Sequence, residues 1–236
     1  MASIARTVLL RKCREPLTRG LRALSVPRPG LRRVRTRGSA RHVNENIEQR
    51  IRRRLGERAI VLVGMMGAGK SSVGRRLGAR LSLDFVDADT EIEKAANATI
   101  SDIFETHGEA FFRDGERRVI RRLIDEGARV VATGGGAYIQ PDTREDLRGR
   151  AVSIWLQAEP DVLIARVRRR NNRPLLKGGD LEETVRRLVA ERDPVYAEAD
   201  LHVRSRDVAH EVVIGDILER LDSWLDGNAG GEDGQR

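Results

Sequence analysis

Short apolar runs alternate with longer amphipathic stretches along most of the chain. The runs at 59–63 and 130–132 contain no polar residue, which is typical of strands buried on both faces. Five of the apolar runs are predicted to be strands, near residues 59–63, 83–89, 129–133, 151–156 and 201–203. Strands separated by helices indicate an α/β fold with a parallel sheet, in which ligands bind beyond the carboxyl ends of the strands.

Apolar residues at helical spacing fill the segments between these runs. The expected helices lie at 44–55, directly after residue 69 (on Val73, Leu77 and Leu81), near 91–96, after the cap formed by Thr99 and Asp102, at 109–127, at 160–170, at 181–191, and at the C-terminal end on Val208, Val212, Ile217, Leu218 and Leu221. The 109–127 helix carries its apolar stripe on Phe112, Val119, Ile120, Leu123 and Ile124. Each helix can therefore cover one face of the sheet.

The first predicted strand runs into a glycine-rich turn, Gly64-x-x-x-x-Gly69-Lys70-Ser71, and a helix follows. Strand, glycine-rich turn and helix form a P-loop, in which backbone N–H groups and the helix N-terminus face phosphate oxygens. Lys70 would reach the β- and γ-phosphates, and Ser71 would hold Mg²⁺. Lys70 is also one of four lysines among 44 basic residues. A glycine-rich turn without a ligand is the alternative interpretation.

Two further groups follow strands and should face the same cleft. Asp87 and Asp89 come at the end of the second strand, and Gly134–Gly136 follow the third. The third strand ends in Thr133 and not in the aspartate that binds metal in many P-loop proteins, so Asp87 is the best candidate for the metal side, directly or through water. Phosphoryl transfer needs positioning and positive charge, which Lys70, Ser71 with Mg²⁺ and a mobile arginine would supply.

An ordered set of short motifs makes the sequence more specific than the P-loop alone. After the P-loop come Val86-Asp-x-Asp89, Ile100-Ser-Asp-Ile-Phe104, Glu109-x-Phe-Phe-Arg113, Gly134-Gly-Gly136, Arg173-Pro-Leu-Leu176 and Arg192-x-Pro-x-Tyr196. With this set, residues 58 to about 220 resemble the shikimate kinases nearly without gaps. The resemblance implies a three-layer nucleoside-monophosphate-kinase fold, with strand order 2-3-1-4-5 and a mobile lid at about 168–181. It also implies Mg²⁺-dependent transfer of the ATP γ-phosphate to the 3-hydroxyl of shikimate, on the route to chorismate and the aromatic amino acids.

The resemblance also implies roles for individual residues. These are catalysis by Lys70, Asp89 and Arg173; ATP binding by Gly67, Ala68, Gly69, Lys70, Ser71, Ser72, Arg166 and Arg173; shikimate binding by Asp89, Arg113, Gly135, Gly136 and Arg192; and Mg²⁺ binding by Ser71 and Asp87. The chemistry agrees, because arginine forks suit a carboxylate, an aspartate suits hydroxyl protons, and glycine allows close approach of the backbone. No role is assigned to the adenine-side segment 204–207.

Each of these residues has a structural alternative. Asp89 could be the N-cap of the helix near Glu91, and the arginines at 113 and 192 could be solvated surface charges. Gly134–Gly136 could be a plain loop, and Arg173 could belong to an ordinary flexible loop. The histidines at 42, 107, 202 and 210 show no ligand spacing, so a zinc site is not expected.

The net charge of +8 belongs to the N-terminal part of the chain. Residues 1–41 carry eleven Arg and one Lys against one Glu, a net charge of +11, which leaves residues 42–236 at −3. We predict a disordered basic extension at 1–42, a catalytic domain at 43–225 and a disordered tail at 226–236. The extension could be an organelle transit peptide, a nonspecific basic arm, or a segment without catalytic consequence.

Composition removes several classes of function. One cysteine excludes an intramolecular disulfide, no run of 18 apolar residues can span a membrane, and an aromatic content of 3% argues against a base-stacking nucleic-acid reader. We therefore expect a cytoplasmic, monomeric enzyme whose partner is a small molecule. A gluconate-type sugar-acid kinase of the same fold and an ATP-binding module without turnover are the alternative functions.

Overall fold

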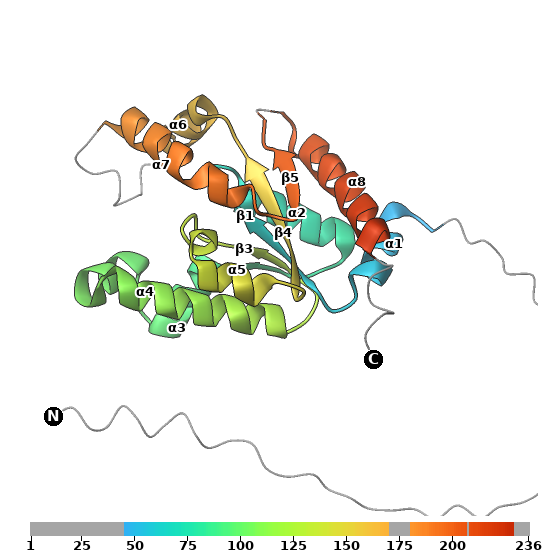
Figure 1. Cartoon of the computed structure of the whole chain (residues 1–236), viewed down its shortest axis with the longest axis horizontal. Coiled ribbons are helices and arrows are strands. Elements are labelled where there is room, and N and C mark those ends of the chain that lie inside the picture. The colour runs from blue at the N-terminus through green and yellow to red at the C-terminus, as the bar shows by residue number, and fades with distance from the viewer. Residues whose placement is uncertain (1–44, 170–179, 207, 229–236) are drawn as a thin grey trace, which may run out of the picture. The chain divides into compact units, whose positions relative to one another are not determined.

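The computed structural model describes residues 45–169, 180–206 and 208–228, and its centre is a parallel sheet of five strands (Figure 1). The strands are β1 (Ala59–Val63), β2 (Phe85–Asp87), β3 (Val130–Ala132), β4 (Ala151–Gln157) and β5 (Leu201–Arg204). Their order across the sheet is β2-β3-β1-β4-β5, and every neighbouring pair is parallel. The predicted fold class and strand order are confirmed.

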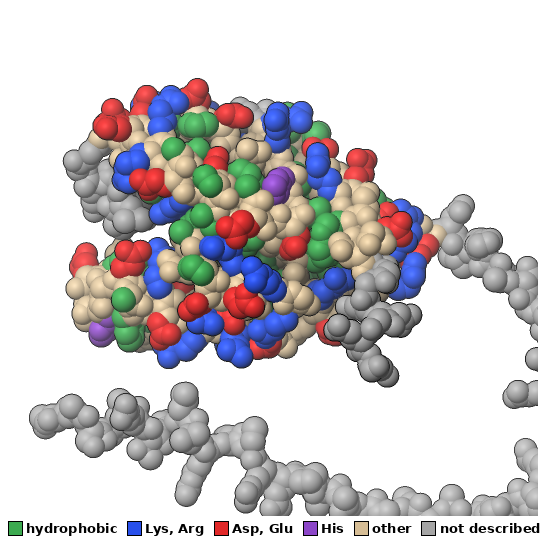
Figure 2. All heavy atoms as spheres, viewed as in Figure 1, with side chains coloured by type: hydrophobic (Ala, Val, Ile, Leu, Met, Phe, Trp, Pro, Cys, Tyr) green, Lys and Arg blue, Asp and Glu red, His purple; other side chains and the backbone are tan. Residues whose placement is uncertain are grey.

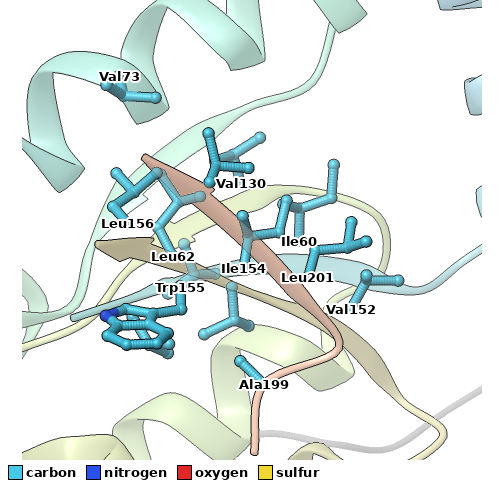
Figure 3. Packing of buried hydrophobic residues seen from close by; sticks show 14 of the residues in the cluster. Ile60, Leu62, Val73, Val130, Val152, Ile154, Trp155, Leu156, Ala199 and Leu201 are labelled. Carbon is cyan, nitrogen blue, oxygen red and sulfur yellow. The ribbon is translucent and has the colours of Figure 1, made fainter. Parts of the chain in front are cut away.

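The central strands supply the core because they are covered on both faces. All five residues of β1 are fully buried, and β4 is buried from Ala151 to Leu156. Val130 pairs with Ile60 on one side, and Val152 pairs with it on the other. Figure 3 shows these side chains packed together with those of β5. A strand buried on both faces needs a continuous apolar run, which explains why the sequence pattern identified these strands.

Helices cover both faces of the sheet. They are α1 (Ile47–Leu55), α2 (Lys70–Leu81), α3 (Ala88–Ala96), α4 (Ile100–Asp125), α5 (Pro141–Leu147), α6 (Pro160–Arg168), α7 (Leu181–Tyr196) and α8 (His210–Asn228), with a short 3-10 helix, η2 (Ala137–Ile139). The helices α1, α2 and α8 pack on one another, whereas α4 packs against α3 and α5, and α6 against α7 (Figure 1). The predicted arrangement of helix, sheet and helix layers is thus present.

Side-chain caps fix where two of the predicted helices begin. Asn46 accepts from the N–H of Gln49, and Gln49 in turn accepts from the N–H of Asn46. Thr99 and Asp102 form the same reciprocal arrangement at the start of α4. These pairs satisfy N–H groups that have no partner inside the helix. Within α4, Gly108 has a φ of 78°, so a new helical segment opens at Glu109, as the sequence predicted.

Helix α7 is longer than predicted. We expected it to end at Glu191, but it continues through Pro194 to Tyr196. A proline removes one backbone donor, and at this position the loss falls near the helix end. The N–H of Ala197 still donates to the carbonyl of Asp193 at 2.9 Å, and Tyr196 is only 1% exposed. Burial of the tyrosine side chain therefore holds the last turn in place.

The start and end of α8 also differ from the prediction. Val208 and Val212 were placed in its apolar stripe, but they are 43% and 52% exposed, and Val213 and Ile214 face the core instead. The helix reaches Asn228, so the first residues of the predicted tail are helical. The 137–147 segment, for which the sequence predicts no element, forms η2 and α5. These helices have three and seven residues, which is too short for a hydrophobic period to be visible.

Several predictions concern residues that the structure does not describe. The basic extension (1–42), most of the lid with Arg173, and residues 229–236 lie outside the described part of the chain. Within the described ranges, no helix combines the length and apolar character needed to cross a bilayer.

Candidate active site

The P-loop joins β1 to α2 at the carboxyl edge of the sheet. Gly64, Gly67 and Gly69 have φ angles of 127°, 83° and 94°, a region that favours glycine, and Gly69 is the N-cap of α2. A side chain at Gly64 would also lie 2.8 Å from the carbonyl oxygen of Leu156 on β4. Both the spacing and the glycine content of the motif are therefore required by this turn.

The side chain of Lys70 lies over its own loop. Its Nζ donates to the carbonyl oxygens of Gly64 at 2.7 Å and Met65 at 3.0 Å. This places an ammonium group directly at the turn where phosphate oxygens are expected. Lys70, Ser71, Ser72, Gly67 and Gly69 all line one small cavity, together with the carboxylates of β2 and α3 and with Gly134 and Gly135.

Ser71 and Asp87 meet as a pair of oxygen ligands. The hydroxyl of Ser71 donates to Oδ2 of Asp87 at 2.7 Å, although the residues come from α2 and β2. Mg²⁺ prefers such oxygen donors and binds through one or two of them together with waters and phosphates. Over the described ranges no group of three or more His, Cys, Asp or Glu side chains could hold a metal ion. The donor set thus fits a Mg²⁺ ion that is shared with a nucleotide.

Asp89 lies in the first turn of α3, and it is not the N-cap of that helix. The N-cap is Asp87, whose Oδ1 accepts from the N–H of Asp89 at 3.2 Å. The alternative that Asp89 serves as a cap is therefore wrong. Its carboxylate is directed toward the glycine loop, where a Cβ on Gly134 would lie 2.8 Å from Asp89 Oδ1.

The three glycines after β3 lie against the charged side chains of the cleft. A Cβ on Gly136 would lie 2.5 Å from Nη2 of Arg113, and one on Gly134 would lie 2.8 Å from Oε1 of Glu116. A Cβ on Gly135 would lie 3.7 Å from Nη1 of Arg192. Gly136 has an ordinary φ of −98°, so space and not backbone conformation requires glycine there. The glycines are the floor on which the acidic and basic groups converge.

Arg113 is held by an acidic partner that the sequence analysis missed. Its Nη1 lies 2.6 Å from Oε2 of Glu116, one turn along α4, and its Nη2 lies 3.1 Å from Oε1 of Glu109. The side chain of Glu116 is 2% exposed, and its Oε1 has no hydrogen-bond partner among the described residues. Burial raises the pKa of Glu116, Arg113 lowers it, and the nearby Asp89 carboxylate raises it further.

A signal for Glu116 was present in the sequence. Phe112, Glu116 and Ile120 follow one another at four-residue spacing, so the glutamate occupies a core position of an amphipathic helix. Charged residues are rarely buried unless they are paired, and a lone carboxylate in an apolar stripe points to a specific partner.

Arg192 reaches the same floor from α7. Its Nη1 donates to the carbonyl oxygen of Gly135 at 3.3 Å, and the hydroxyl of Tyr196 donates to the same oxygen. Burial raises the pKa of Tyr196 to about 12, so the hydroxyl keeps its proton at neutral pH. The sequence predicts no role for Tyr196, because the predicted helix ends at Glu191; in the structure Tyr196 lies four residues after Arg192 on α7.

A second cavity, of about 310 Å³, lies beside the P-loop. Gly67, Gly69, Ser72 and Arg166 line it, together with Ser205 and the start of α8. Arg166 donates to the carbonyl oxygens of Gly67 at 3.3 Å and Arg206 at 2.8 Å. The predicted ATP residues in the described part of the chain are thus gathered around one loop.

The surface is hollowed between the regions of α7 and α4, at the left of the molecule in Figure 2. Arg113 and Arg192 come from these two helices and both reach the glycine floor. The structure therefore brings together the P-loop, the Ser71–Asp87 pair, Asp89 and both arginines. Arg173 lies outside the described residues, and its role stays a prediction.

The parallel sheet has the order 2-3-1-4-5, a P-loop follows β1, and a charged cleft with Asp89, Arg113 and Arg192, which we call the acceptor cleft, lies beside it. These features define a P-loop kinase that acts on small molecules. The family model of shikimate kinase matches residues 66–222. The chain belongs to the shikimate kinase family.

Similar proteins agree with this assignment. The chain is 58% identical over 171 residues to a shikimate kinase from Rhodopseudomonas palustris, an alignment that covers 72% of this chain and 84% of the relative. It is 59% identical over 173 residues to one from Bradyrhizobium diazoefficiens, covering 73% and 84%. A solved shikimate kinase from Acinetobacter baumannii in complex with shikimate aligns with a TM-score of 0.67 and 40% identity, covering 71% of this chain and 94% of that one.

A gluconokinase from Sinorhizobium meliloti bears on the alternative function. It aligns with a TM-score of 0.50 over 75% of this chain and 98% of its own, but only 18% of the residues are identical. Such a likeness supports the fold alone. The comparisons therefore do not favour the sugar-acid kinase.

Proposed function

We propose that this chain transfers the γ-phosphoryl group of ATP to the 3-hydroxyl of shikimate, giving shikimate 3-phosphate and ADP. Membership of the shikimate kinase family supports the reaction. The observation that carries the assignment of the site is the convergence of Asp89, Arg113 and Arg192 on Gly134–Gly136. One carboxylate and two guanidinium groups match a small acceptor that has hydroxyls and a carboxylate.

Asp89 is the group assigned to the acceptor hydroxyl. Its carboxylate lies at the glycine floor, in the cavity that also contains Lys70. There it can accept a hydrogen bond from the hydroxyl and direct its oxygen toward the phosphoryl group. Glycine at position 134 leaves room for this carboxylate, because a Cβ there would lie 2.8 Å from Asp89 Oδ1.

Arg113 and Arg192 are assigned to the substrate carboxylate. Each guanidinium offers a planar set of donors that binds a carboxylate through two hydrogen bonds. Glu116 keeps Arg113 in place, and the carbonyl of Gly135 does the same for Arg192. The backbone of Gly135 and Gly136 lies between the two arginines and can contact the ring of the substrate.

The P-loop is assigned to the phosphates of ATP, and Arg166 to the nucleotide cavity. Gly67, Ala68, Gly69 and Ser72 supply backbone and hydroxyl groups, and Lys70 neutralises charge on the transferring group. Mg²⁺ held by Ser71 and Asp87 would neutralise charge on the β- and γ-phosphates. Arg173 is assigned to the phosphates because of its motif, without structural support.

We further propose a monomer that acts in the cytoplasm on a small-molecule partner. Asp89, Arg113 and Arg192 all come from one chain, so the site needs no residue from a second copy. ATP is supplied in the cytoplasm, and the similar proteins are bacterial shikimate kinases. Sedimentation at several protein concentrations tests the oligomeric state.

The reaction itself is tested by coupled detection of ADP with three acceptors. Shikimate, quinate and gluconate should be offered separately at equal concentration, with Mg²⁺ and ATP. We expect turnover with shikimate and less than about a hundredth of that rate with gluconate, a difference of about 2.7 kcal/mol in activation free energy. Equal or faster turnover of gluconate would contradict the proposed function.

A further inference from the structure

Ser205 is a buried hydroxyl at the centre of the nucleotide side, in the segment to which the sequence analysis assigned no role. It follows β5 and is only 5% exposed. Its backbone N–H donates to the carbonyl oxygen of Gln157 at the end of β4 at 2.6 Å. The residue is therefore anchored to the edge of the sheet before its side chain makes any contact.

The hydroxyl of Ser205 connects two parts of the site. It donates to the carbonyl oxygen of Ala68 in the P-loop at 2.7 Å, and it accepts from Nη1 of Arg166 at 3.0 Å. These residues lie 137 and 39 positions away in the chain. A hydroxyl has one proton and two lone pairs, so it can donate to one group and accept from the other at the same time.

The bond to Ala68 has a consequence for phosphate binding. In a planar trans peptide the C=O and the following N–H point in opposite directions. Fixing the carbonyl of Ala68 therefore fixes the direction of the N–H of Gly69, at the N-terminus of α2. Gly69 has a φ of 94°, and glycine permits rotation of this peptide in the absence of a restraint.

The bond from Arg166 has a consequence for the nucleotide cavity. Arg166 also donates to Gly67 and Arg206, so its guanidinium spans the P-loop and the segment after β5. Loss of the Ser205 acceptor removes one of the three groups that orient it. The free-energy cost of leaving a buried donor or acceptor unpaired exceeds the net stabilisation by an ordinary hydrogen bond.

We propose that Ser205 is a positioning residue for ATP: its hydroxyl sets the orientation of the Ala68–Gly69 peptide and of the Arg166 guanidinium together. This inference rests on the proposed function, because it takes the P-loop side as the ATP site. It predicts a defect confined to nucleotide binding, although Ser205 need not touch the nucleotide.

The test compares three substitutions with one matched control. Ser205→Ala removes the hydroxyl, Ser205→Cys keeps the size with a weak donor, and Ser205→Thr keeps the hydroxyl. Ser153→Ala is the control, because Ser153 is a buried hydroxyl (4% exposed) that bonds to Asp200 at 2.6 Å and lines neither cavity of the site. The Kd of ADP and of AMP, the KM of ATP and of shikimate, kcat and the Tm are measured for each full-length chain.

We expect Ser205→Ala and Ser205→Cys to raise the Kd of ADP and the KM of ATP about tenfold, with the KM of shikimate within twofold of wild type. Ser205→Thr should restore ADP binding to within about threefold. The Kd of AMP should rise less than that of ADP, because AMP lacks the β-phosphate that the P-loop binds. Ser153→Ala should lower the Tm without changing the Kd of ADP.

Two outcomes would overturn the inference. If Ser205→Ala lowers the Tm like Ser153→Ala but leaves the Kd of ADP unchanged, the hydroxyl has only a structural role. If AMP and ADP binding weaken equally, the P-loop part of the inference is wrong. Since the ADP titration contains no shikimate, failure of wild type to phosphorylate shikimate would contradict the proposed function separately.

Discussion

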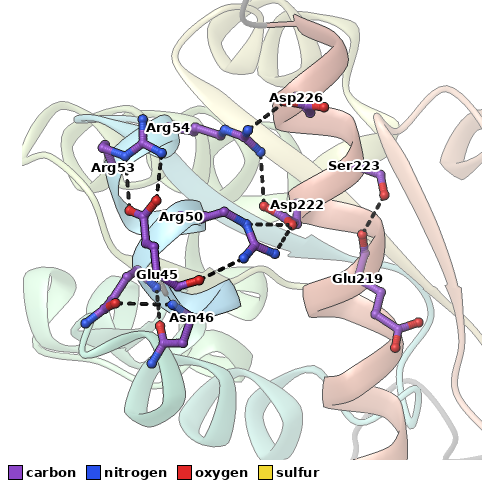
Figure 4. Close-up of polar contacts among 10 residues, drawn as sticks. Glu45, Asn46, Arg50, Arg53, Arg54, Glu219, Asp222, Ser223 and Asp226 are labelled. Carbon is purple, nitrogen blue, oxygen red and sulfur yellow. Dashed lines mark hydrogen bonds and ion pairs between the residues drawn. The ribbon is translucent and has the colours of Figure 1, made fainter. Parts of the chain in front are cut away.

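Arginine side chains serve different purposes at the two ends of α2. At the far end, α1 is fastened to α8 by a group that we call the clasp, formed by Arg50, Arg54, Asp222 and Asp226 (Figure 4). At the near end, beside the P-loop, Arg113 and Glu116 form the ion pair of the acceptor cleft. Both groups consist of arginines and carboxylates, so composition alone does not distinguish them.

The two groups differ in how completely the charges are paired. In the clasp, Oδ2 of Asp222 accepts from Arg50 at 2.7 Å and Oδ1 accepts from Arg54 at 3.2 Å, so both oxygens are used. In the cleft, Oε1 of Glu116 is buried without a hydrogen-bond partner among the described residues. An incompletely paired buried carboxylate destabilises the fold. The clasp therefore stabilises the domain, whereas the cleft keeps a costly charge that we propose serves substrate binding.

The largest effects are expected where the charges meet the reacting groups. Lys70→Ala removes the ammonium group that we propose neutralises charge on the transferring phosphoryl group, and Asp89→Asn removes the carboxylate that we propose orients the acceptor hydroxyl. Both should lower kcat by about a thousandfold or more, roughly 4 kcal/mol in activation free energy. In an ADP titration, Asp89→Asn should bind like wild type, whereas Lys70→Ala should bind more weakly. Equal losses of ADP affinity in the two variants would instead assign Asp89 to the metal side of the site.

The second effect concerns the cleft arginine. Arg113→Lys keeps the charge and loses the fork, so the Kd of shikimate should rise by about one to two powers of ten while ATP binding stays unchanged. Arg113→Ala should cost at least as much, because a charge-assisted hydrogen bond contributes about 1.5–3 kcal/mol. The control is a shikimate analogue without the carboxylate. If wild type and Arg113→Ala discriminate equally against that analogue, the two arginines do not bind the carboxylate.

The third effect concerns Glu116, whose carboxylate is paired with Arg113 through one oxygen only. Glu116→Gln keeps the shape of the side chain and removes the charge that holds Arg113, so the KM of shikimate should rise about tenfold with a smaller change in kcat. Since the pKa of Glu116 is raised above its ordinary 4.5, wild type should lose affinity for shikimate as the pH falls through that raised value. Glu116→Gln should have a high KM across the same pH range.

The pH dependence of stability should run in the opposite direction to that of shikimate affinity. The folded state has the higher pKa and binds the proton more tightly, so this group stabilises the fold most below the unfolded pKa of about 4.5. That contribution is lost as the pH rises through the folded pKa. The free energy of unfolding of Glu116→Gln should lack this fall, and a Glu116→Gln profile parallel to wild type would show that the group titrates normally.

The same contrast explains what could be predicted from the sequence. Buried strands such as β1 and β4 need continuous apolar runs, and the P-loop needs glycines at fixed positions, so both were visible as patterns. Glu116 pairs with Arg113 one turn earlier on the same helix, and the apolar stripe around Glu116 indicates only that this charge is buried. Tyr196 contacts Gly135 from the last turn of α7, beyond the predicted end of that helix at Glu191. Ser205 contacts residues far away in the chain, and no local pattern indicates that.

The ion pairs of the clasp could not be predicted from the sequence either. The helix formed by α1 was predicted from Ile47, Ile51 and Leu55, and the latter two are indeed buried. Its arginines gave no sign of a partner about 170 positions later, because sequence spacing carries no information on contacts between elements so far apart. Charge pairing across the fold had to come from the structure.

The smallest effect is expected in the clasp and concerns stability alone. Asp222→Ala removes the partner shared by Arg50 and Arg54, and the Tm should fall by about 2–4 °C, as is typical of a modest loss in a domain of this size. Asp226→Ala is the matched control, because Asp226 is 69% exposed against 17% for Asp222 and contacts only Arg54 among the clasp residues. Its Tm should stay within about 1 °C of wild type, since exposed ion pairs contribute little.

Both variants should keep kcat and both KM values, because α1 contacts the far end of α2, where Arg52 donates to the carbonyl of Leu81, and not the P-loop end. A drop in kcat without a drop in Tm for Asp222→Ala would show that the clasp acts on the site, and the division between assembly charges and substrate charges would then be wrong.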